Sequence, residues 1–187
     1  VLPYTIGDYL SDEISTGPIA NDSEEFIIAE KEVKEKLDTL INNKGSKSVD
    51  YFHKKLGKIM WNKCGMARNK KDLELAISEI SKLRKEFWKE VKVPGDQNEF
   101  NEELAKAGRV ADFLELGELF AKDALEREES CGGHFREEYQ TKEGEATRKK
   151  EFQFVSAWEY VGEPRDAILH KEKLEYKNIE VKERSYK

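Results

Sequence analysis

Apolar side chains recur along this chain at the three- and four-residue spacing of amphipathic helices. The clearest stripe consists of Leu73, Ala76, Ile77, Ile80, Leu83, Phe87 and Val91. Asn69 precedes the stripe and can cap a helix, while Pro94 and Gly95 follow it and end one. The pattern therefore predicts one helix between Asn69 and Pro94.

Similar stripes predict helices on the amino-terminal side of this one. An apolar segment at the start of the chain is expected to form a helix that ends near Ile14. Asp22 and Glu25 resemble a capping box, and the helix after them has an apolar face to about residue 42: Phe26, Val33, Leu37 and Ile41. Ser48 can cap the next helix, whose face carries Phe52, Leu56, Ile59, Met60 and Cys64.

The longest predicted helix covers about residues 98–127, and its apolar positions occupy more than one face. A helix of this kind is usually buried between neighbours. After Gly132 and Gly133 the sequence becomes polar and irregular. Residues 152–161 are rich in aromatic and β-branched side chains and predict a strand, and a second strand over about 168–176 completes a hairpin. A lone hairpin is marginal in water, so we expect it to pack on the helices, on another domain, or on both.

Composition excludes several classes of protein. The chain has 187 residues, of which 39% are charged, and its net charge is -6. Lys and Arg are spread along the chain, so no basic stripe for nucleic acid is present. No apolar run reaches the ~18 residues of a membrane span, which argues against direct membrane insertion. The two cysteines suggest no disulfide framework and favour a reducing, cytosol-facing compartment. Because the chain begins at Val1 inside a helical pattern, we expect it to be part of a longer protein.

The densest polar cluster is residues 126–141, EREESCGGHFREEYQT. One interpretation is a turn that holds His134 and Arg136 at a domain edge, where Arg136 could pair with a carboxylate. The other is a glycine helix stop followed by a solvated charged loop. Arg68 is also open to two interpretations, because it could reach a neighbouring domain or neutralise the carboxyl end of the preceding helix.

Metal and catalytic sites are not predicted. Cys131 and His134 are three residues apart, but the other candidate ligands, His53 and Cys64, belong to a different helix, and a structural zinc site needs four ligands. Cys64 is expected in the core and His53 on a helix surface. His170 is expected to pair with Glu172 or to face solvent. No nucleotide-binding glycine loop, nucleophile elbow or acid–base pair is recognisable.

Several segments together resemble the flavoprotein subunits of succinate dehydrogenases and fumarate reductases of the bacterial, anaerobe type. The matching segments are MWNKCGMARN, KLRKEFWKEVKVPG, ELAKAGRVADFLELGEL, REESCGGHFREEYQT, FVSAWEY, ILHKEKLEY and the terminal RSY. The resemblance covers essentially the whole chain. It implies a mainly α fold: a three-helix, spectrin-repeat-like bundle with flanking helices, then a small β-hairpin and an extended tail. Many relatives have E-S-R-G-x-H where this chain has Cys131 and His134, which puts in doubt any role assigned to that arginine.

The resemblance also implies what the chain does and does not carry. The parent subunit is an oxidoreductase that interconverts succinate and fumarate, and it holds FAD in a domain that precedes these residues. This chain is expected to bind no cofactor and to catalyse nothing alone. Its implied partners are that flavin-binding domain and an iron–sulfur subunit, in a complex peripheral to the inner face of the cell membrane. The candidate interface residues are Arg68, His134, Arg136 and Arg184.

Three segments follow from pattern and resemblance together. Residues 1–20 are expected to end the helix that leaves the flavin domain, 21–130 to form the helical bundle, and 131–187 to form the loop, hairpin and tail. Two alternatives remain. The chain could be a stand-alone helical protein-interaction module, or the equivalent domain of an L-aspartate oxidase-like flavoenzyme.

Overall fold

The computed structural model describes residues 6–7, 10, 21–96 and 99–179. The chain divides into two compact units, residues 1–39 and 40–187. The boundary falls inside helix α2 (Glu24–Asn42), near its carboxyl end. At the amino end of this helix, the Ile27 amide donates to the Ser23 carbonyl. Most of the predicted helix ending near Ile14, and Arg184 in the predicted tail, lie outside the described residues.

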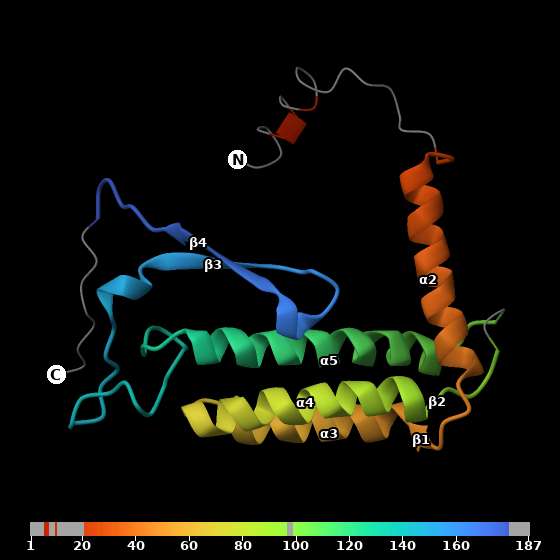
Figure 1. Ribbon diagram of the computed structural model, residues 1–187, viewed down its shortest axis with the longest axis horizontal. Helices are drawn as coiled ribbons and strands as arrows, with labels where there is room; N and C mark the ends of the chain where they lie inside the picture. Colours follow the sequence, from red (N-terminus) through yellow and green to blue (C-terminus); the bar gives the residue numbers. More distant parts are fainter. Residues whose placement is uncertain (1–5, 8–9, 11–20, 97–98, 180–187) are drawn as a thin grey trace. The chain divides into compact units, whose positions relative to one another are not determined.

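The second unit is built on three helices that run side by side (Figure 1): α3 (Val49–Lys63), α4 (Lys70–Glu90) and α5 (Glu102–Glu126). Two predicted caps are confirmed. The Tyr51 amide donates to Ser48 Oγ over 3.2 Å, and the Asp72 amide donates to Asn69 Oδ1 over 2.9 Å. These bonds satisfy amides that have no partner within their own helix.

Helix α5 begins at Glu102, so its predicted start near residue 98 was wrong. Asn101 is the cap, and its Oδ1 accepts from the Leu104 amide over 3.0 Å. Asn101 Nδ2 also donates to the Pro94 carbonyl over 2.9 Å, which ties the start of α5 to the end of the preceding segment. The apolar pattern alone did not reveal this start because the preceding residues carry no feature that forbids a helix.

The core lies between the three helices and contains the buried side chains that the stripes predicted. Those from α3 and α4 are Phe52, Leu56, Ile59, Leu73, Ala76, Ile80, Leu83 and Phe87, and those from α5 include Leu104, Ala107, Val110, Leu114 and Ala121. Helix α5 approaches α3 closely at Gly117, where a Cβ would lie 3.4 Å from Leu56 Cδ1 and 3.5 Å from Met60 Sδ. Close packing of this kind makes each buried leucine worth roughly 2–5 kcal/mol against alanine.

A short parallel pair that no sequence pattern predicted joins the ends of two helices. Strand β1 (Lys47–Ser48) pairs with β2 (Val91–Lys92), with Lys47 opposite Val91. A Cβ on Gly45 would lie 2.1 Å from the backbone of Glu90, so the chain can pass the end of α4 only with glycine there.

The predicted hairpin is confirmed and consists of β3 (Phe154–Glu159) and β4 (Ile168–Lys173), paired antiparallel. Two short 3₁₀ turns, η1 (Lys150–Phe152) and η2 (Pro164–Asp166), precede and follow β3. The second strand ends before the predicted Tyr176.

The hairpin packs against α5 through polar contacts. Trp158 Nε1 donates to Asp123 Oδ1 over 2.8 Å, and Lys122 Nζ donates to the Arg165 and Ala167 carbonyls over 2.7 and 3.0 Å. His170 pairs with Glu159 on the opposite strand, 2.6 Å away, so the first alternative, pairing with Glu172, was wrong. The second alternative is confirmed, because the His170 side chain is exposed to solvent. The mainly helical fold with a small antiparallel strand pair is thus confirmed. No helix in the described part of the chain is both long and apolar enough to span a bilayer.

Candidate functional site

The segment after α5 forms a tight turn. The helix ends at Glu126, and the Arg127 amide closes its last turn by donating to the Asp123 carbonyl. The Cys131 amide then donates to the His134 carbonyl over 2.8 Å, and the His134 amide returns to the Cys131 carbonyl over 3.1 Å. Gly132 has φ +59°, a conformation that glycine adopts without strain. The glycines therefore make a turn between Cys131 and His134, and the alternative that they stop the helix was wrong.

Arg136 lies inside the molecule, with 1% of its surface exposed. Its NH1 donates to the carbonyls of Ala124 and Leu125 over 3.0 and 3.1 Å, and its Nε donates to Glu138 Oε2 over 3.1 Å. The guanidinium therefore caps the carboxyl end of α5, where a positive charge is favourable. Because Ser130 is buried beside it, the alternative of a solvated loop was wrong at these positions.

Arg68 joins the α3–α4 corner to this segment. Its amide donates to the Phe135 carbonyl over 3.1 Å, and its own carbonyl accepts from the Glu137 amide over 2.8 Å. Its side chain contacts both segments. Nε donates to the carbonyl of Gly65 in the α3–α4 corner over 3.0 Å, and NH1 lies 2.9 Å from Nδ1 of His134 in the segment after α5. Two residues that the sequence placed far apart thus come into direct contact.

The hydrogen bonds of His134 determine its tautomer. Arginine only donates, so Nδ1 accepts from Arg68, and the proton is on Nε2, which donates to the Arg127 carbonyl over 2.9 Å. Burial lowers the pKa of His134 below its usual value, and the neighbouring arginines lower it further. His134 is therefore neutral at physiological pH, and burial likewise lowers the pKa of Arg68.

An exposed apolar surface begins at Arg68, whose guanidinium carbon lies 5.0 Å from the centre of the Phe120 ring. Phe113, Leu116 and Phe120 lie on one side of α5, and 43%, 60% and 47% of their surfaces are exposed. With His53 and Met60 of α3 they line a groove of about 310 Å³. We call these five residues the α3–α5 face. The sequence had indicated that α5 is apolar on several sides, but not which side is uncovered.

A second pocket of about 310 Å³ adjoins the α3–α5 face at Phe120. It is lined by Arg68, Phe120, Asp123, Ala124, Arg127, Cys131 and His134. Arg127 is paired with Glu129 over 2.8 Å, and Asp123 accepts the Trp158 bond. We call it the Arg68 pocket. It contains two of the four predicted interface residues, Arg68 and His134, while Arg136 is buried and does not line it, and Arg184 is outside the described residues.

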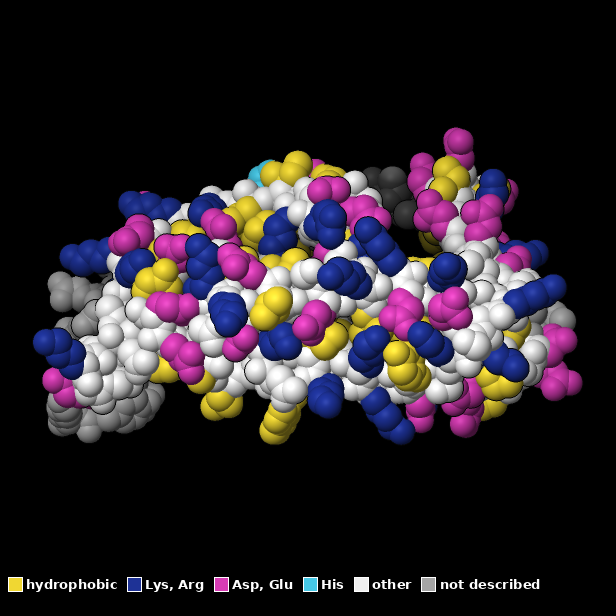
Figure 2. Space-filling model, turned by 60° about the horizontal axis from the view of Figure 1, so that its bottom comes forward, with side chains coloured by type: hydrophobic (Ala, Val, Ile, Leu, Met, Phe, Trp, Pro, Cys, Tyr) yellow, Lys and Arg dark blue, Asp and Glu magenta, His cyan; other side chains and the backbone are white. Residues whose placement is uncertain are grey.

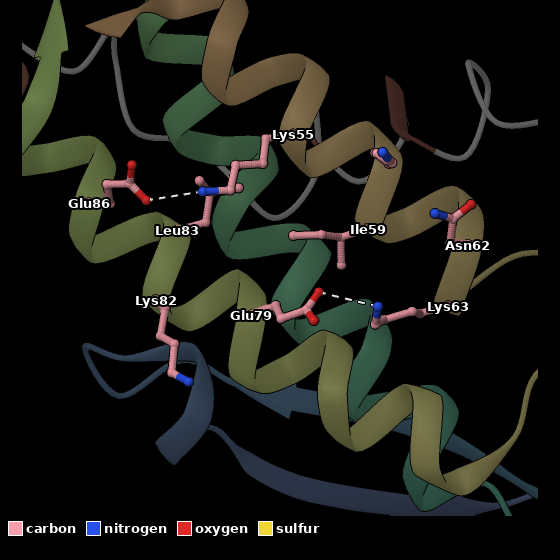
Figure 3. A pocket seen from close by; sticks show the side chains of 9 residues that line it. Lys55, Ile59, Asn62, Lys63, Glu79, Lys82, Leu83 and Glu86 are labelled. Atoms are coloured by element: carbon pink, nitrogen blue, oxygen red, sulfur yellow. Dashed lines mark hydrogen bonds and ion pairs between the residues drawn. The ribbon is translucent and has the colours of Figure 1, made fainter. Parts of the chain in front are cut away.

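A pocket of about 500 Å³ between α3 and α4 is lined by several lysines (Figure 3). Two of them already have acidic partners, since Lys55 lies 3.3 Å from Glu86 and Lys63 lies 3.4 Å from Glu79. Figure 2 shows basic and acidic side chains interspersed over the visible face, with hydrophobic ones between them. The cations of this pocket therefore form no continuous basic surface.

The residues described contain no group of three or more His, Cys, Asp or Glu side chains that could hold a metal ion. Cys64 is buried, as predicted, and burial raises the pKa of its thiol. His53 is exposed, also as predicted, and its ring centre lies 6.0 Å from that of Phe113.

Sequence reasoning missed a buried charged pair, Arg84 and Glu118, because it assigned the carboxylates mostly to polar helix faces. Glu118 is fully buried, and its Oε2 lies 3.4 Å from Arg84 Nε. A signal was available, since Glu118 stands in helical register with the buried residues Leu114 and Ala121.

Comparisons with known proteins mainly find similarity to fumarate reductase flavoproteins. A family model described as "Fumarate reductase flavoprotein C-term" matches residues 53–186. The chain is 28% identical over 109 residues to the fumarate reductase flavoprotein subunit of Haemophilus influenzae, covering 58% of the chain and 18% of that protein. It is 31% identical over 150 residues to an uncharacterised FAD-dependent oxidoreductase of Methanocaldococcus jannaschii, covering 73% of the chain and 26% of that protein.

Its fold is similar to that of a chain in a solved structure of Escherichia coli quinol fumarate reductase. The TM-score is 0.71 at 22% identity, over 86% of this chain and 27% of that one. At this identity the similarity establishes the fold alone. The chain spans only a small part of the length of each relative it matches.

Proposed function

The chain belongs to the family of fumarate reductase flavoprotein carboxyl-terminal domains, and on that premise we propose that it supports the flavin-binding part of such a subunit through the α3–α5 face. The observation that carries the proposal is the exposed stripe Phe113, Leu116 and Phe120 beside the half-buried Arg68. Contiguous apolar surface rimmed by polar groups commonly marks a protein contact. An arginine among aromatic side chains is a frequent anchor of such contacts.

The activity of the whole protein is part of the same proposal. The flavin-binding part would hold FAD and interconvert succinate and fumarate, passing electrons to or from an iron–sulfur subunit. The complex would lie on the inner face of the cell membrane. This chain would contribute support and contacts, and it would bind no FAD and turn over no dicarboxylate by itself.

Within this proposal, the four predicted interface residues have different roles. Arg68 and His134 line a pocket that is open to a partner. Arg136 acts from inside by holding the last turn of α5 in place. Arg184 is proposed to contact the rest of the subunit together with the tail.

The test compares two exposed leucines, Leu116 of the α3–α5 face and Leu75 of α4, of which 60% and 42% are exposed. Each is changed to Asp, both in this chain alone and in the complete flavoprotein subunit. In the chain alone we expect both variants to unfold within about 0.5 kcal/mol of each other, since surface substitutions are mild. In the complete subunit we expect Leu116→Asp to lower FAD retention and dicarboxylate turnover, because it places a charge in an apolar contact.

The Leu75→Asp subunit is expected to retain its FAD and activity. Equal behaviour of the two complete subunits would exclude the α3–α5 face as the contact. Succinate oxidation or FAD binding by the chain alone would overturn the proposed support role.

A further inference from the structure

Arg68 is held in one orientation but keeps unused donors. Its guanidinium has five N–H groups, of which one donates to the Gly65 carbonyl and one to His134 Nδ1. Phe120 lies against the side chain and limits its movement. The remaining donors, including both on NH2, have no hydrogen-bond partner among the residues described, and Arg68 forms no ion pair with any of them.

The neighbours of Arg68 compensate its charge only in part, because Asp123 attracts it from beyond ion-pair distance while burial still lowers the pKa of Arg68. Arg127 is neutralised by Glu129, and His134 is neutral in the tautomer described above. Asp123 is the acidic residue that lines the pocket, and its carboxylate accepts from Trp158. A half-buried cation whose acidic neighbour lies beyond ion-pair distance is stabilised further by a ligand that supplies a carboxylate in direct contact.

The arrangement of the unused N–H groups of Arg68 favours a carboxylate as the ligand. NH1 and NH2 present parallel N–H groups, which match the two oxygens of a planar carboxylate. Asp123 would repel a dianion such as phosphate more strongly than a single carboxylate. Phe120, on the apolar side of the pocket, suits the carbon atoms that carry a carboxylate.

We propose that the Arg68 pocket binds one carboxylate group, which Arg68 holds through the N–H edge shared by NH1 and NH2. The carboxylate comes either from an acidic side chain of the docked flavin-binding domain or from a small organic acid. Only the first source rests on the proposed function. The binding itself is a property of this chain.

The experiment is an NMR titration of the 187-residue chain that follows the Arg68 Nε–H and the His134 ring nitrogens. The probes are acetate and succinate, with sodium chloride at matched ionic strength as the control. Both probes are expected to give saturable shifts, and the bound anion is expected to raise the pKa of His134. Sodium chloride is expected to give neither effect.

Three variants make the titration specific. Arg68→Lys should weaken acetate binding about tenfold, because an ammonium cannot form the bidentate pair. Arg109→Lys, at an exposed position of α5, should leave binding unchanged. Asp123→Asn should tighten binding severalfold, because it removes the opposing charge while an amide oxygen can still accept from Trp158. Because Asp123→Asn is expected to strengthen acetate binding, a defect in folding cannot produce the same result.

The two probes also identify the source. Succinate that binds within about twofold of acetate indicates a site for one acidic side chain, since two equivalent carboxylates add only a statistical factor of about two. Succinate that binds more than tenfold tighter indicates a free dicarboxylic acid.

Shifts that chloride reproduces, binding that Arg68→Lys leaves unchanged, or binding that Asp123→Asn weakens would each overturn the proposal. If binding fails while Leu116→Asp still disrupts the complete subunit, the proposed function stands and only the carboxylate site is lost.

Discussion

Two arginines are buried in different regions of the molecule, and their surroundings differ in kind. Arg136, at the end of α5, is surrounded by hydrogen-bond acceptors, namely the carbonyls of Ala124 and Leu125 and the carboxylate of Glu138. Arg84, in the middle of α4, is surrounded by carboxylates, with Glu118, Glu115 and Glu163 all within ion-pair distance.

The bonding of the two sites differs accordingly. Neither Glu118 oxygen has a hydrogen-bond partner among the residues described, and the same is true of Arg84 Nε. Burial raises the pKa of the Glu118 carboxyl, although Arg84 opposes that shift. Buried charge can thus be accommodated mainly by hydrogen bonds to carbonyls, as at Arg136, or by several carboxylates, as at Arg84, where Glu163 accepts a hydrogen bond and Glu118 and Glu115 act by attraction. The second arrangement depends more strongly on each partner being present.

The largest loss of stability is expected for Arg84→Met, because this change leaves Glu118 buried without its nearest positive charge. The free energy of unfolding should fall by about 3–5 kcal/mol at pH 7. Urea unfolding followed by circular dichroism measures it. Lys82→Met, at an exposed position of the same helix, is the control and should change stability by less than about 0.5 kcal/mol.

The double variant Arg84→Met with Glu118→Leu should recover most of this loss, since removing a buried pair together is often neutral. A double variant as unstable as Arg84→Met alone would show that Glu118 is not the reason for the loss.

A smaller effect is expected for Arg136→Met. It removes the donors to two carbonyls at the end of α5 and should lower the free energy of unfolding by about 2–3 kcal/mol. Amide hydrogen exchange should accelerate first in the segment that follows α5, where the Arg136 amide bonds to Ser130. Arg109→Met is the matched exposed control. Uniform acceleration across all three helices would contradict a local capping role for Arg136.

The smallest effect is the pH dependence introduced by Glu118. Its folded-state pKa is raised above the usual 4.5, so its contribution to stability is complete below that pH and is lost as the pH rises through the raised value. Glu118→Gln cannot ionise, so its stability relative to the original chain should increase as the pH rises above 4.5. A difference that stays constant with pH would contradict the assigned titration.

Much of the fold could be predicted because it rests on local features. Ser48 and Asn69 are recognisable caps, and the stripe from Leu73 to Phe87 is correct for nearly every residue. The strand over 154–159 follows from its aromatic and β-branched composition. Each feature depends on residues a few positions apart, which sequence periodicity reports directly.

The candidate site could be predicted only in part. Arg68 and His134 were named separately, each with two possible roles, and their contact joins residues 66 positions apart. The burial of Arg136 was not foreseen either, because its partners belong to the end of a preceding helix. Nothing in the local sequence distinguishes an arginine that points outward from one that turns back on a helix end.

The amino-acid sequence by itself determined where the helices and the hairpin form, since caps, turns and apolar spacing act over one or two turns of the chain. The tertiary structure decided which polar groups are enclosed and which apolar groups are left uncovered. Arg84, Glu118 and Arg136 are buried because helices from distant parts of the chain close over them, whereas Leu116 and Phe120 are exposed because the three-helix bundle has no fourth helix on that side in the described residues of the second unit.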